Sequence, residues 1–292
     1  RKANRRAAFP SAKMGKRGLS ALMDCDDDGA RFVTDVLLDT LAYAAFIVPD
    51  VSDDIYSIDG AMKVGYNWKK GPFEMMDSIG VPSMVRRLQE TGREVPKFLS
   101  QAQEKGSFYS IEDGEIMKLC SSGEMVVVER PEETLNVADL KRRGKPLKRN
   151  GSASIWDMGD GVLLVEYHTK MNAMDPMNIE MLVNAVDIAE SDGFKGIVIG
   201  NGASNFCAGA NLGLALFAAN LGAWKDLEDF ITLGQETYQT LKYCEVPVVA
   251  ASAGLCLGGG AEVLMHCDAV QAHAESYICL LYTSDAADER TW

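Results

Sequence analysis

Apolar residues recur at the three- and four-residue spacing of amphipathic helices through most of the first half of the chain. The acidic run 24–28 precedes one such stretch, which continues until Pro49, and carboxylates favour the positive N-terminal end of a helix. Further helices are expected over 82–104, and alternation of apolar and polar residues is absent before residue 125. This pattern predicts a first half made of helices.

Proline and glycine mark a short helix in the same half. A helical pattern follows Ser52, and then Gly71 and Pro72 open the segment PFEMMDSI, which Gly80 closes. Proline is favoured in the first turn because its missing N–H would be unsatisfied there anyway, and glycine is favoured just after the last turn. The sequence therefore predicts a capped helix that packs on its neighbours.

The second half alternates between segments with the character of strands and segments with the character of helices. We expect strands over 154–158, 162–167, 196–200, 247–252 and 268–272, and helices over 178–190, 211–222, 226–243 and from 258 onward. The turn Gly159-Asp160-Gly161 joins the first two strands. Such alternation is typical of an α/β layered fold.

The length of 292 residues indicates two domains, because one domain typically holds about 100–200 residues. The segment 129–151 is polar, charged and poor in large apolar residues, and the last residues show no apolar periodicity. We predict a helical domain over 1–128, a charged linker over 129–151, an incomplete α/β domain over 152–278 and a non-native tail over 279–292. Because the chain also begins without Met, we expect a fragment that is open at both ends.

Charge and cysteine content exclude several classes of protein. The net charge of −13 argues against a nucleic-acid partner, which usually requires a basic face. The seven cysteines include no CxxC pair, a pattern typical of a reducing compartment. No signal-peptide apolar region follows the basic N-terminal residues, and no apolar stretch is long enough to span a bilayer. We therefore expect a cytoplasmic protein without a transmembrane segment.

The familiar cofactor motifs are absent from the sequence. There is no GxxxxGK[ST] or HExxH motif, and the histidines and cysteines lack the spacing of a zinc site. Gly200 and Gly202 begin like a dinucleotide fingerprint, but Asn205 stands at the third glycine position. We expect no metal and no bound cofactor in this chain.

Two segments combine a strand end with the start of a helix, NFCAGANL at 205–212 and GLCLGGGAE at 254–262. Each segment alone has a structural explanation, because small residues permit close packing and glycine permits positive φ. Together they present free backbone N–H groups at two helix N-termini, where negative charge is favoured. Two such amides on one carbonyl oxygen form an oxyanion hole, and Glu262 could then hold a water or transfer a proton.

These motifs resemble the paired oxyanion motifs of the crotonase (enoyl-CoA hydratase/isomerase) superfamily, over roughly residues 152–278. The segment KMNAM at 170–174 stands where that family has its first acyl-CoA-contacting loop. The resemblance implies a ββα fold and an acyl-CoA thioester as substrate. It also implies that Ala210 and Gly259 supply the oxyanion amides and that Glu262 is a catalytic glutamate.

The resemblance further implies residues along the CoA and acyl path, namely Lys170, Met171, Ala208, Asn211, Leu212 and Gly258. Asn211 departs from the family, many members of which have Asp at this position. The second family glutamate falls near Tyr282, inside the segment predicted to be a non-native tail. The implied reaction is hydration of a 2-trans-enoyl-CoA to a 3-hydroxyacyl-CoA, and the resemblance leaves open whether this chain performs it alone.

The first half has a second resemblance. The segment GAMKVGYNWKKGPFEMMDSIG at 60–80 is similar to the helical C-terminal domain of 3-hydroxyacyl-CoA dehydrogenases, and the match spans about 1–120. In that family an NAD-binding domain comes first, so we expect NAD in a missing upstream domain and no dehydrogenase catalytic residue here. Together the two resemblances imply a multifunctional fatty-acid β-oxidation enzyme that forms a homo-oligomer or associates with other β-oxidation enzymes.

Two alternatives to hydration stay open at this point. One is isomerisation of an enoyl-CoA within the same superfamily, although Glu262 favours hydration because isomerases typically use the second glutamate position. The other is an acyl-CoA-binding or assembly module without catalytic activity.

Overall fold

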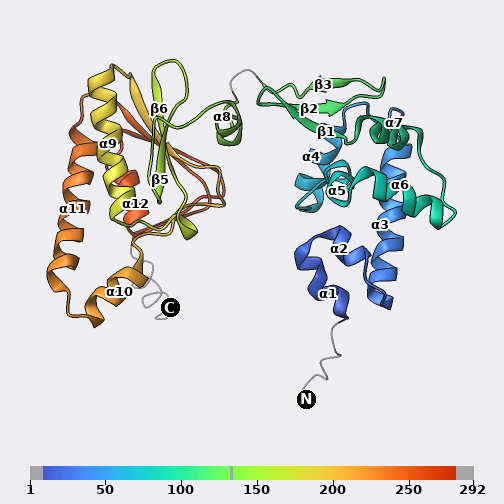
Figure 1. Ribbon diagram of the computed structural model, residues 1–292. Helices are drawn as coiled ribbons and strands as arrows, with labels where there is room; N and C mark the ends of the chain where they lie inside the picture. Colours follow the sequence, from blue (N-terminus) through green and yellow to red (C-terminus); the bar gives the residue numbers. More distant parts are fainter. Residues whose placement is uncertain (1–8, 132–133, 281–292) are drawn as a thin grey trace, which may run out of the picture. The chain divides into compact units, whose positions relative to one another are not determined.

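The computed structural model describes residues 9–131 and 134–280, and the chain divides into two compact units (Figure 1). Unit 1 is Arg1–Thr134 and unit 2 is Leu135–Trp292. Unit 1 is mainly helical, whereas unit 2 alternates strands and helices, in the order that the sequence predicts.

Unit 1 contains a cluster of helices followed by a small sheet. Its elements are α1 (Pro10–Met14), η1 (Gly15–Arg17), α2 (Leu19–Met23), α3 (Asp28–Phe46), α4 (Ile55–Tyr66), α5 (Pro72–Ile79), α6 (Val81–Glu90), α7 (Lys97–Lys105), β1 (Tyr109–Glu112), β2 (Glu115–Leu119) and β3 (Met125–Val127). The apolar faces of the helices enclose one core, in which Phe73 and Phe108 are fully buried with ring centroids 5.0 Å apart. Edge-to-face contacts of this kind add to the burial of apolar area.

The helix predicted after the acidic run is α3. Asp27 caps it, since its carboxylate accepts a hydrogen bond of 2.9 Å from the N–H of Ala30. The helix ends at Phe46, shortly before Pro49. The acidic run therefore sets the start of this helix through one specific side chain.

The short helix predicted between Pro72 and Gly80 is α5, and a buried carboxylate holds its first turn. Asp59 accepts hydrogen bonds from the N–H groups of Phe73 and Glu74, at 2.9 and 3.1 Å, and from the hydroxyl of Tyr109 at 2.9 Å. Burial raises the pKa of Asp59 to about 6, although these hydrogen bonds act in the opposite direction. A Cβ atom at Gly71 would overlap Asp59, so the glycine before this helix is required by close packing.

Unit 1 also contains a sheet that the sequence pattern does not predict. β1, β2 and β3 form an antiparallel meander in which β1 and β2 are joined by Asp113 and Gly114, both with positive φ. The side chains of β1 and β2 are mostly half-buried and do not alternate between buried and exposed positions. The two-residue period of burial that is typical of a strand with one buried face is therefore missing. The Asp-Gly pair, which favours a tight hairpin turn, is the local signal for these strands.

Unit 2 is built on a six-stranded sheet in the order β11-β9-β7-β6-β5-β4. These strands are β4 (Lys148–Arg149), β5 (Ala153–Asp157), β6 (Val162–Tyr167), β7 (Gly196–Gly200), β9 (Val248–Ser252) and β11 (Ala269–Ala272). Neighbouring strands from β6 to β11 are parallel, whereas β5 is antiparallel to β6 and β4 is antiparallel to β5. The predicted strands of this half are therefore confirmed, with shifts of at most one residue at their ends.

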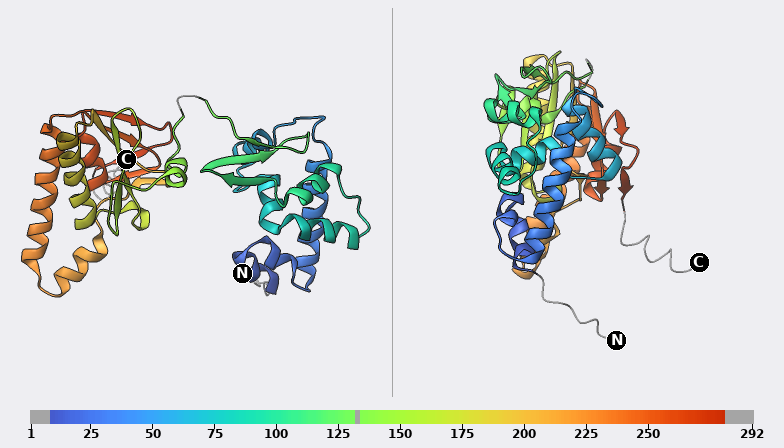
Figure 2. Two further views of the ribbon diagram at one scale, coloured as in Figure 1. Left: turned by 45° about the horizontal axis from the view of Figure 1, so that its top comes forward. Right: turned by 90° about the vertical axis from the view of Figure 1, so that its right-hand side faces the viewer.

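Helices cover the core face of this sheet. They include α9 (Pro176–Asp192) and α11 (Trp224–Tyr243), which run side by side in Figures 1 and 2 and pack against each other. α9 also contacts β5, β6 and β7. The shorter helices of unit 2 are α8 (Val137–Arg143), η2 (Lys170–Asn172), α10 (Leu212–Asn220) and α12 (Gly259–Met265).

A second, smaller sheet contains three short strands, two of which lie in the segments 205–212 and 254–262. β8 (Asn205–Cys207), β10 (Leu255–Leu257) and β12 (Tyr277–Cys279) lie parallel in the order β12-β10-β8. Each strand has only three residues, which is too short for a periodic pattern in the sequence. α12 packs against β8 and β10, so this sheet supports the glycine-rich helix start.

The segment predicted as a charged linker, 129–151, contains regular structure. α8 lies within it, and β4 adds an exposed antiparallel strand to the edge of the main sheet. Charged residues suit such an edge because they discourage pairing with other chains. The predicted tail begins at Cys279, which lies in β12, and residues 281–292 lie outside the described part of the chain. Within 9–131 and 134–280, none of the helices has the length and apolar composition required to cross a membrane.

The raised pKa of Asp59 makes the stability of unit 1 depend on pH. The folded state holds the proton of the Asp59 carboxyl more tightly than the unfolded state does. The stabilisation that results is therefore present below pH 4 and is lost as the pH rises from about 4 to 6. The unfolding free energy should fall by about 2–3 kcal/mol over this range relative to an Asp59→Asn variant. Native-state hydrogen exchange at the amides of α5 measures this difference for unit 1. An Asp50→Asn variant, at an exposed position, should follow the unmodified protein, and a pH-independent difference for Asp59→Asn would contradict the assignment.

Candidate active site

Three segments that the sequence analysis singles out follow strands directly. The segment 170–174 follows β6, 208–211 follows β8, and 258–262 follows β10. β8 and β10 are parallel neighbours in the smaller sheet, so their carboxyl ends lie at one edge, where ligand sites of α/β proteins commonly lie. β6 belongs to the main sheet, and a bridge between Met174 and Ala210 joins the segment after it to the loop after β8.

Backbone hydrogen bonds join the first two segments. The N–H of Ala208 donates to the carbonyl of Met171 at 3.2 Å, and the N–H of Met174 donates to the carbonyl of Gly209 at 2.8 Å. The N–H of Asn211 donates in turn to the carbonyl of Met174 at 2.8 Å. These bonds fix the predicted acyl-CoA loop against the predicted oxyanion loop.

Glycine permits the second and third segments to meet. A Cβ atom at Gly209 would lie 2.8 Å from the carbonyl oxygen of Leu257 and 3.5 Å from the nitrogen of Gly259. Gly209 also has a φ of +84°, which side chains disfavour. A Cβ atom at Gly260 would lie 2.7 Å from the carbonyl oxygen of Cys207. The helix start can therefore approach β8 and its loop only without side chains at these positions.

The two predicted oxyanion amides are available for a ligand. In extended backbone, successive residues direct their N–H and C=O groups to opposite sides of the strand. The carbonyl of Gly209 and the N–H of Asn211, which flank Ala210, both form hydrogen bonds with Met174. The N–H of Ala210 therefore points away from that loop. The N–H of Gly259 belongs to the first turn of α12, where no intrahelical acceptor exists. Within the described residues neither N–H has a hydrogen-bond acceptor, although Ala210 is exposed and Gly259 is half-buried.

Glu262 lies in the first turn of α12, beside these amides. Its N–H donates to the carbonyl of Gly258 at 3.0 Å, and its carboxylate oxygen lies 3.7 Å from the place that a Cβ atom of Gly259 would occupy. The side chain is half-buried. A carboxylate in this position can reach a water or a proton on a group held by the neighbouring amides.

Tyr238, on α11, is a member of this region that the sequence analysis does not identify. Its hydroxyl donates to the carbonyl of Gly259 at 3.3 Å and approaches the sulfur of Met174 at 3.7 Å. Its ring stacks on His266 with centroids 5.2 Å apart. Burial raises the pKa of Tyr238, and the charge of Glu262 raises it further, so the hydroxyl keeps its proton at neutral pH. No local motif marks this tyrosine, because only the packing of α11 brings it to the site.

The remaining predicted residues surround the same region. Lys170 and Met171 are exposed at the surface, and Leu212 is 77% exposed at the start of α10. Asn211 caps α10 by accepting a hydrogen bond from the N–H of Leu214, and Gly258 donates its N–H to the carbonyl of Cys279 at 2.9 Å. The capping bond explains how Asn serves at a position where a carboxylate would also cap the helix.

An apolar cavity of about 250 Å³ lies beside this region. Its lining includes Pro176, Asn211, Leu214, Phe217, Leu227 and Phe230. α10 and α11 therefore shape an apolar space next to one of the residues predicted to lie on the acyl path.

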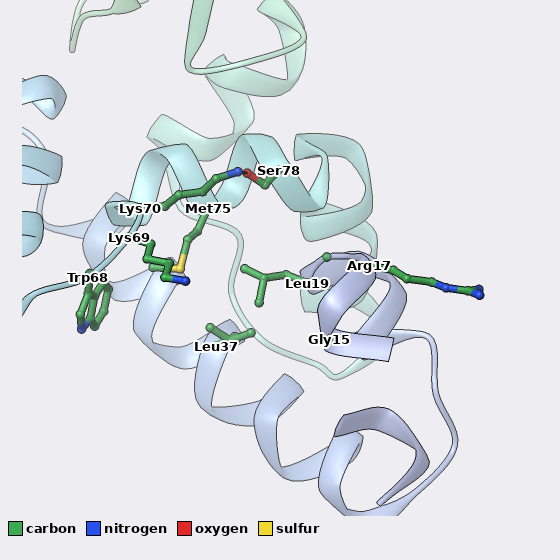
Figure 3. Close-up of a pocket in the computed structure, with 10 residues that line it drawn as sticks. Gly15, Arg17, Leu19, Leu37, Trp68, Lys69, Lys70, Met75 and Ser78 are labelled. Atoms are coloured by element: carbon green, nitrogen blue, oxygen red, sulfur yellow. Dashed lines mark hydrogen bonds between the residues drawn. The ribbon is translucent and has the colours of Figure 1, made fainter. Parts of the chain in front are cut away.

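Unit 1 has its own, larger cavity of about 850 Å³ (Figure 3). Leu19, Leu37 and Met75 contribute apolar side chains, and Lys70 donates a hydrogen bond to Ser78 at its rim. Part of its lining comes from the segment 60–80, which carries the second resemblance. None of the residues that the sequence analysis assigns to the site lines it.

Comparison with known proteins finds a family that part of the second unit resembles. Residues 157–283 match the family model described as enoyl-CoA hydratase/isomerase. The match lies within unit 2. The predicted fold class, a helical domain followed by a crotonase-like domain, is confirmed.

Three relatives illustrate the similarity. A Bacillus subtilis protein named "Probable 3-hydroxyacyl-CoA dehydrogenase" is 35% identical over 276 residues, which cover 94% of this chain and 35% of that protein. A Rickettsia felis "Putative fatty acid oxidation complex trifunctional enzyme" is 30% identical, over 88% of this chain and 33% of its own length. The "Crotonyl-CoA hydratase" of Syntrophomonas wolfei is 34% identical, over 37% of this chain and 40% of its own. The chain thus spans about a third of the length of the first two relatives.

The close approach at Gly260 leads to a specific stability prediction. A Gly260→Ala variant places a methyl group 2.7 Å from backbone and side-chain atoms of Cys207, so α12 must move, at a cost of about 1–3 kcal/mol. Calorimetry should show one thermal transition lowered by roughly 2–8 °C. The control is Gly234→Ala within α11, where the added methyl group makes an ordinary 3.8 Å contact with Ile179. This control should match or exceed the original stability, and equal behaviour of the two variants would contradict the packing argument.

Proposed function

We propose that unit 2 belongs to the machinery that hydrates 2-trans-enoyl-CoA to 3-hydroxyacyl-CoA in fatty-acid β-oxidation. The observation that supports this proposal most directly is the contact between the loop at Gly209 and the start of α12 at Gly259. The N–H groups of Ala210 and Gly259 have no acceptor among the described residues, and a carboxylate oxygen of Glu262 lies 3.7 Å from the place that a Cβ atom of Gly259 would occupy, which supports a role for all three in our proposal. The family match over 157–283 supports the same reaction class.

In this proposal the thioester oxygen of the substrate accepts hydrogen bonds from the N–H groups of Ala210 and Gly259. Water adds its oxygen to Cβ and a proton reaches Cα, so that negative charge develops on the thioester oxygen during the reaction. Donors aimed at such charge are worth about 10²–10³ in rate each, because they need no reorganisation. Glu262 orients the water and relays a proton.

A second carboxylate is part of the proposed reaction. The family resemblance puts it near Tyr282, which lies outside the described residues. We therefore expect full turnover from the longer protein of which this sequence forms part, and acyl-CoA binding from the present chain.

The substrate path follows the neighbouring surface. Lys170, Met171 and Ala208 line the CoA side of the path in our proposal, with Gly258 at the thioester. The acyl chain passes Asn211 and Leu212 toward the apolar cavity between α10 and α11. An apolar space next to free amides suits a ligand with an acyl chain and a polar thioester.

For the longer protein we propose a second activity, NAD-dependent oxidation of the 3-hydroxyacyl-CoA that hydration produces. The similarity of the chain to the Bacillus subtilis protein named "Probable 3-hydroxyacyl-CoA dehydrogenase" supports this step. NAD would bind in a domain outside the present chain. A cytoplasmic location and association with further β-oxidation enzymes stay predictions from the sequence.

Replacement of Glu262 by Gln tests the catalytic role. The variant should bind an acyl-CoA with unchanged affinity but hydrate crotonoyl-CoA about 10²–10⁴-fold more slowly, because Gln cannot exchange a proton. Calorimetry measures binding, and the loss of enoyl absorbance with the longer protein measures hydration. Glu228→Gln on the exposed surface of α11 is the matched control and should leave both unchanged.

The same assays separate the alternatives. Acyl-CoA binding without any turnover in the longer protein would indicate a binding module. A shifted double bond in place of a 3-hydroxyl group in the product would indicate an isomerase. Undiminished hydration by the Glu262→Gln variant would remove this residue from the mechanism.

A further inference from the structure

A polar cavity lies on the face of the main sheet of unit 2 that points away from the core. It encloses about 360 Å³ between the segment after α8 and the outward side chains of β5 and β6. Strand alternation explains the lining, because Ile155 points into the core while Ser154 and Trp156 line the cavity. None of the residues assigned to acyl-CoA chemistry lines it.

The cavity carries an excess of positive charge. Lys141, Lys145 and Arg149 contribute three cations, and Glu166 contributes one carboxylate. The ammonium of Lys141 lies 2.5 Å from one oxygen of Glu166. Among the described residues, Lys145 and Arg149 have no acidic partner. Two exposed cations are therefore available to an anion, even though the whole chain has a net charge of −13.

Glu166 has an unsatisfied oxygen in this setting. Its side chain is 6% exposed, and its Oε2 atom is buried without a hydrogen-bond partner in the described part of the chain. A buried acceptor without a donor costs about 1–3 kcal/mol, and more when it is charged. The side chain of Glu166 lines the cavity, and its other oxygen, Oε1, already accepts from Lys141. The site therefore calls for a hydrogen-bond donor as well as a negative charge.

Three further residues of the lining are joined by hydrogen bonds. The indole N–H of Trp156 donates to the hydroxyl oxygen of Ser154 at 2.9 Å, and that hydroxyl lies 3.0 Å from Nε2 of His168. Burial lowers the pKa of His168, Glu166 opposes this effect, and Arg149 and Lys141 reinforce it. The imidazole is therefore neutral at pH 7 and adds no charge to the cavity.

We propose that this cavity binds a phosphate monoester group that keeps one proton. Its charged oxygens bind Lys145 and Arg149, and its remaining P–OH donates to the free oxygen of Glu166. A protonated phosphate supplies both the negative charge for the two cations and the hydrogen-bond donor for Glu166. Sulfate carries no proton near neutral pH, so it would supply only the negative charge. The inference stands independently of the proposed hydratase reaction, because it concerns other residues and is measured without turnover.

Calorimetric titration of the chain with inorganic phosphate and with sulfate at pH 6.5 tests this proposal. Phosphate should bind at least tenfold more tightly than sulfate. A Glu166→Gln variant should lose this preference, because an amide N–H can donate to either anion. Arg149→Ala, at an exposed position, should weaken binding of both anions, and Glu180→Gln on the exposed surface of α9 should change neither.

Two further titrations distinguish the source of the phosphate. CoA carries a phosphate monoester on its ribose, and 3′-dephospho-CoA lacks it. If CoA supplies the group, loss of this phosphate and the Arg149→Ala substitution should weaken CoA binding by similar factors. If another molecule supplies it, CoA should not compete with inorganic phosphate.

Equal affinity of the unmodified chain for phosphate and sulfate, or no binding of either, would overturn the assignment. The Glu262→Gln variant should retain phosphate binding. A failure of the hydratase proposal is therefore distinguishable from a failure of this one.

Discussion

The close approach of two backbone segments in unit 2 is the constraint on which its site depends. The loop after β8 and the start of α12 meet with Gly209 against Leu257 and with Gly260 against Cys207. Both contacts leave no space for a side chain, because a Cβ atom would lie within 2.8 Å of a carbonyl oxygen in each case. The short parallel sheet of β8, β10 and β12 holds the two segments in this register. Without that approach, the N–H of Ala210 would lie apart from the N–H of Gly259 and from Glu262, which α12 holds together.

The helices α5, in unit 1, and α12, in unit 2, differ in how the N–H groups of their first turns are used. In unit 1 the first turn of α5 is fully occupied by the protein itself, since Asp59 accepts from Phe73 and Glu74. In unit 2 the N–H of Gly259 has no acceptor among the described residues. The N–H groups at the start of a helix thus stabilise the fold in unit 1, whereas in unit 2 one of them remains available to a ligand. The buried carboxylate of Asp59 is costly, as its raised pKa shows, and three donors offset part of that cost.

Charge is distributed according to the tertiary structure rather than the composition. The chain is acidic overall, and the basic run 141–149 lies within the segment 129–151 that the sequence predicts to be a charged linker. In the fold, this segment lies over the outer face of β5 and β6 and meets the buried Glu166. A cationic cavity therefore exists on an acidic protein. The strand alternation that gives unit 2 its core also places Ser154, Glu166 and His168 together on the opposite face.

The sequence by itself determined the long elements and the chemical character of the site. Helical periodicity, the acidic run 24–28 and Pro72 at a first turn were sufficient for α3 and α5, and glycine-rich junctions indicated free amides near Glu262. The sequence could not determine the three-residue strands β8, β10 and β12, because so few residues carry no period. Tertiary packing alone brought Tyr238 from α11 to Gly259, and the Lys141 ammonium to Glu166. These contacts join residues about 20 or more positions apart, and local sequence patterns report only the neighbours that a helix turn or a strand pleat brings together.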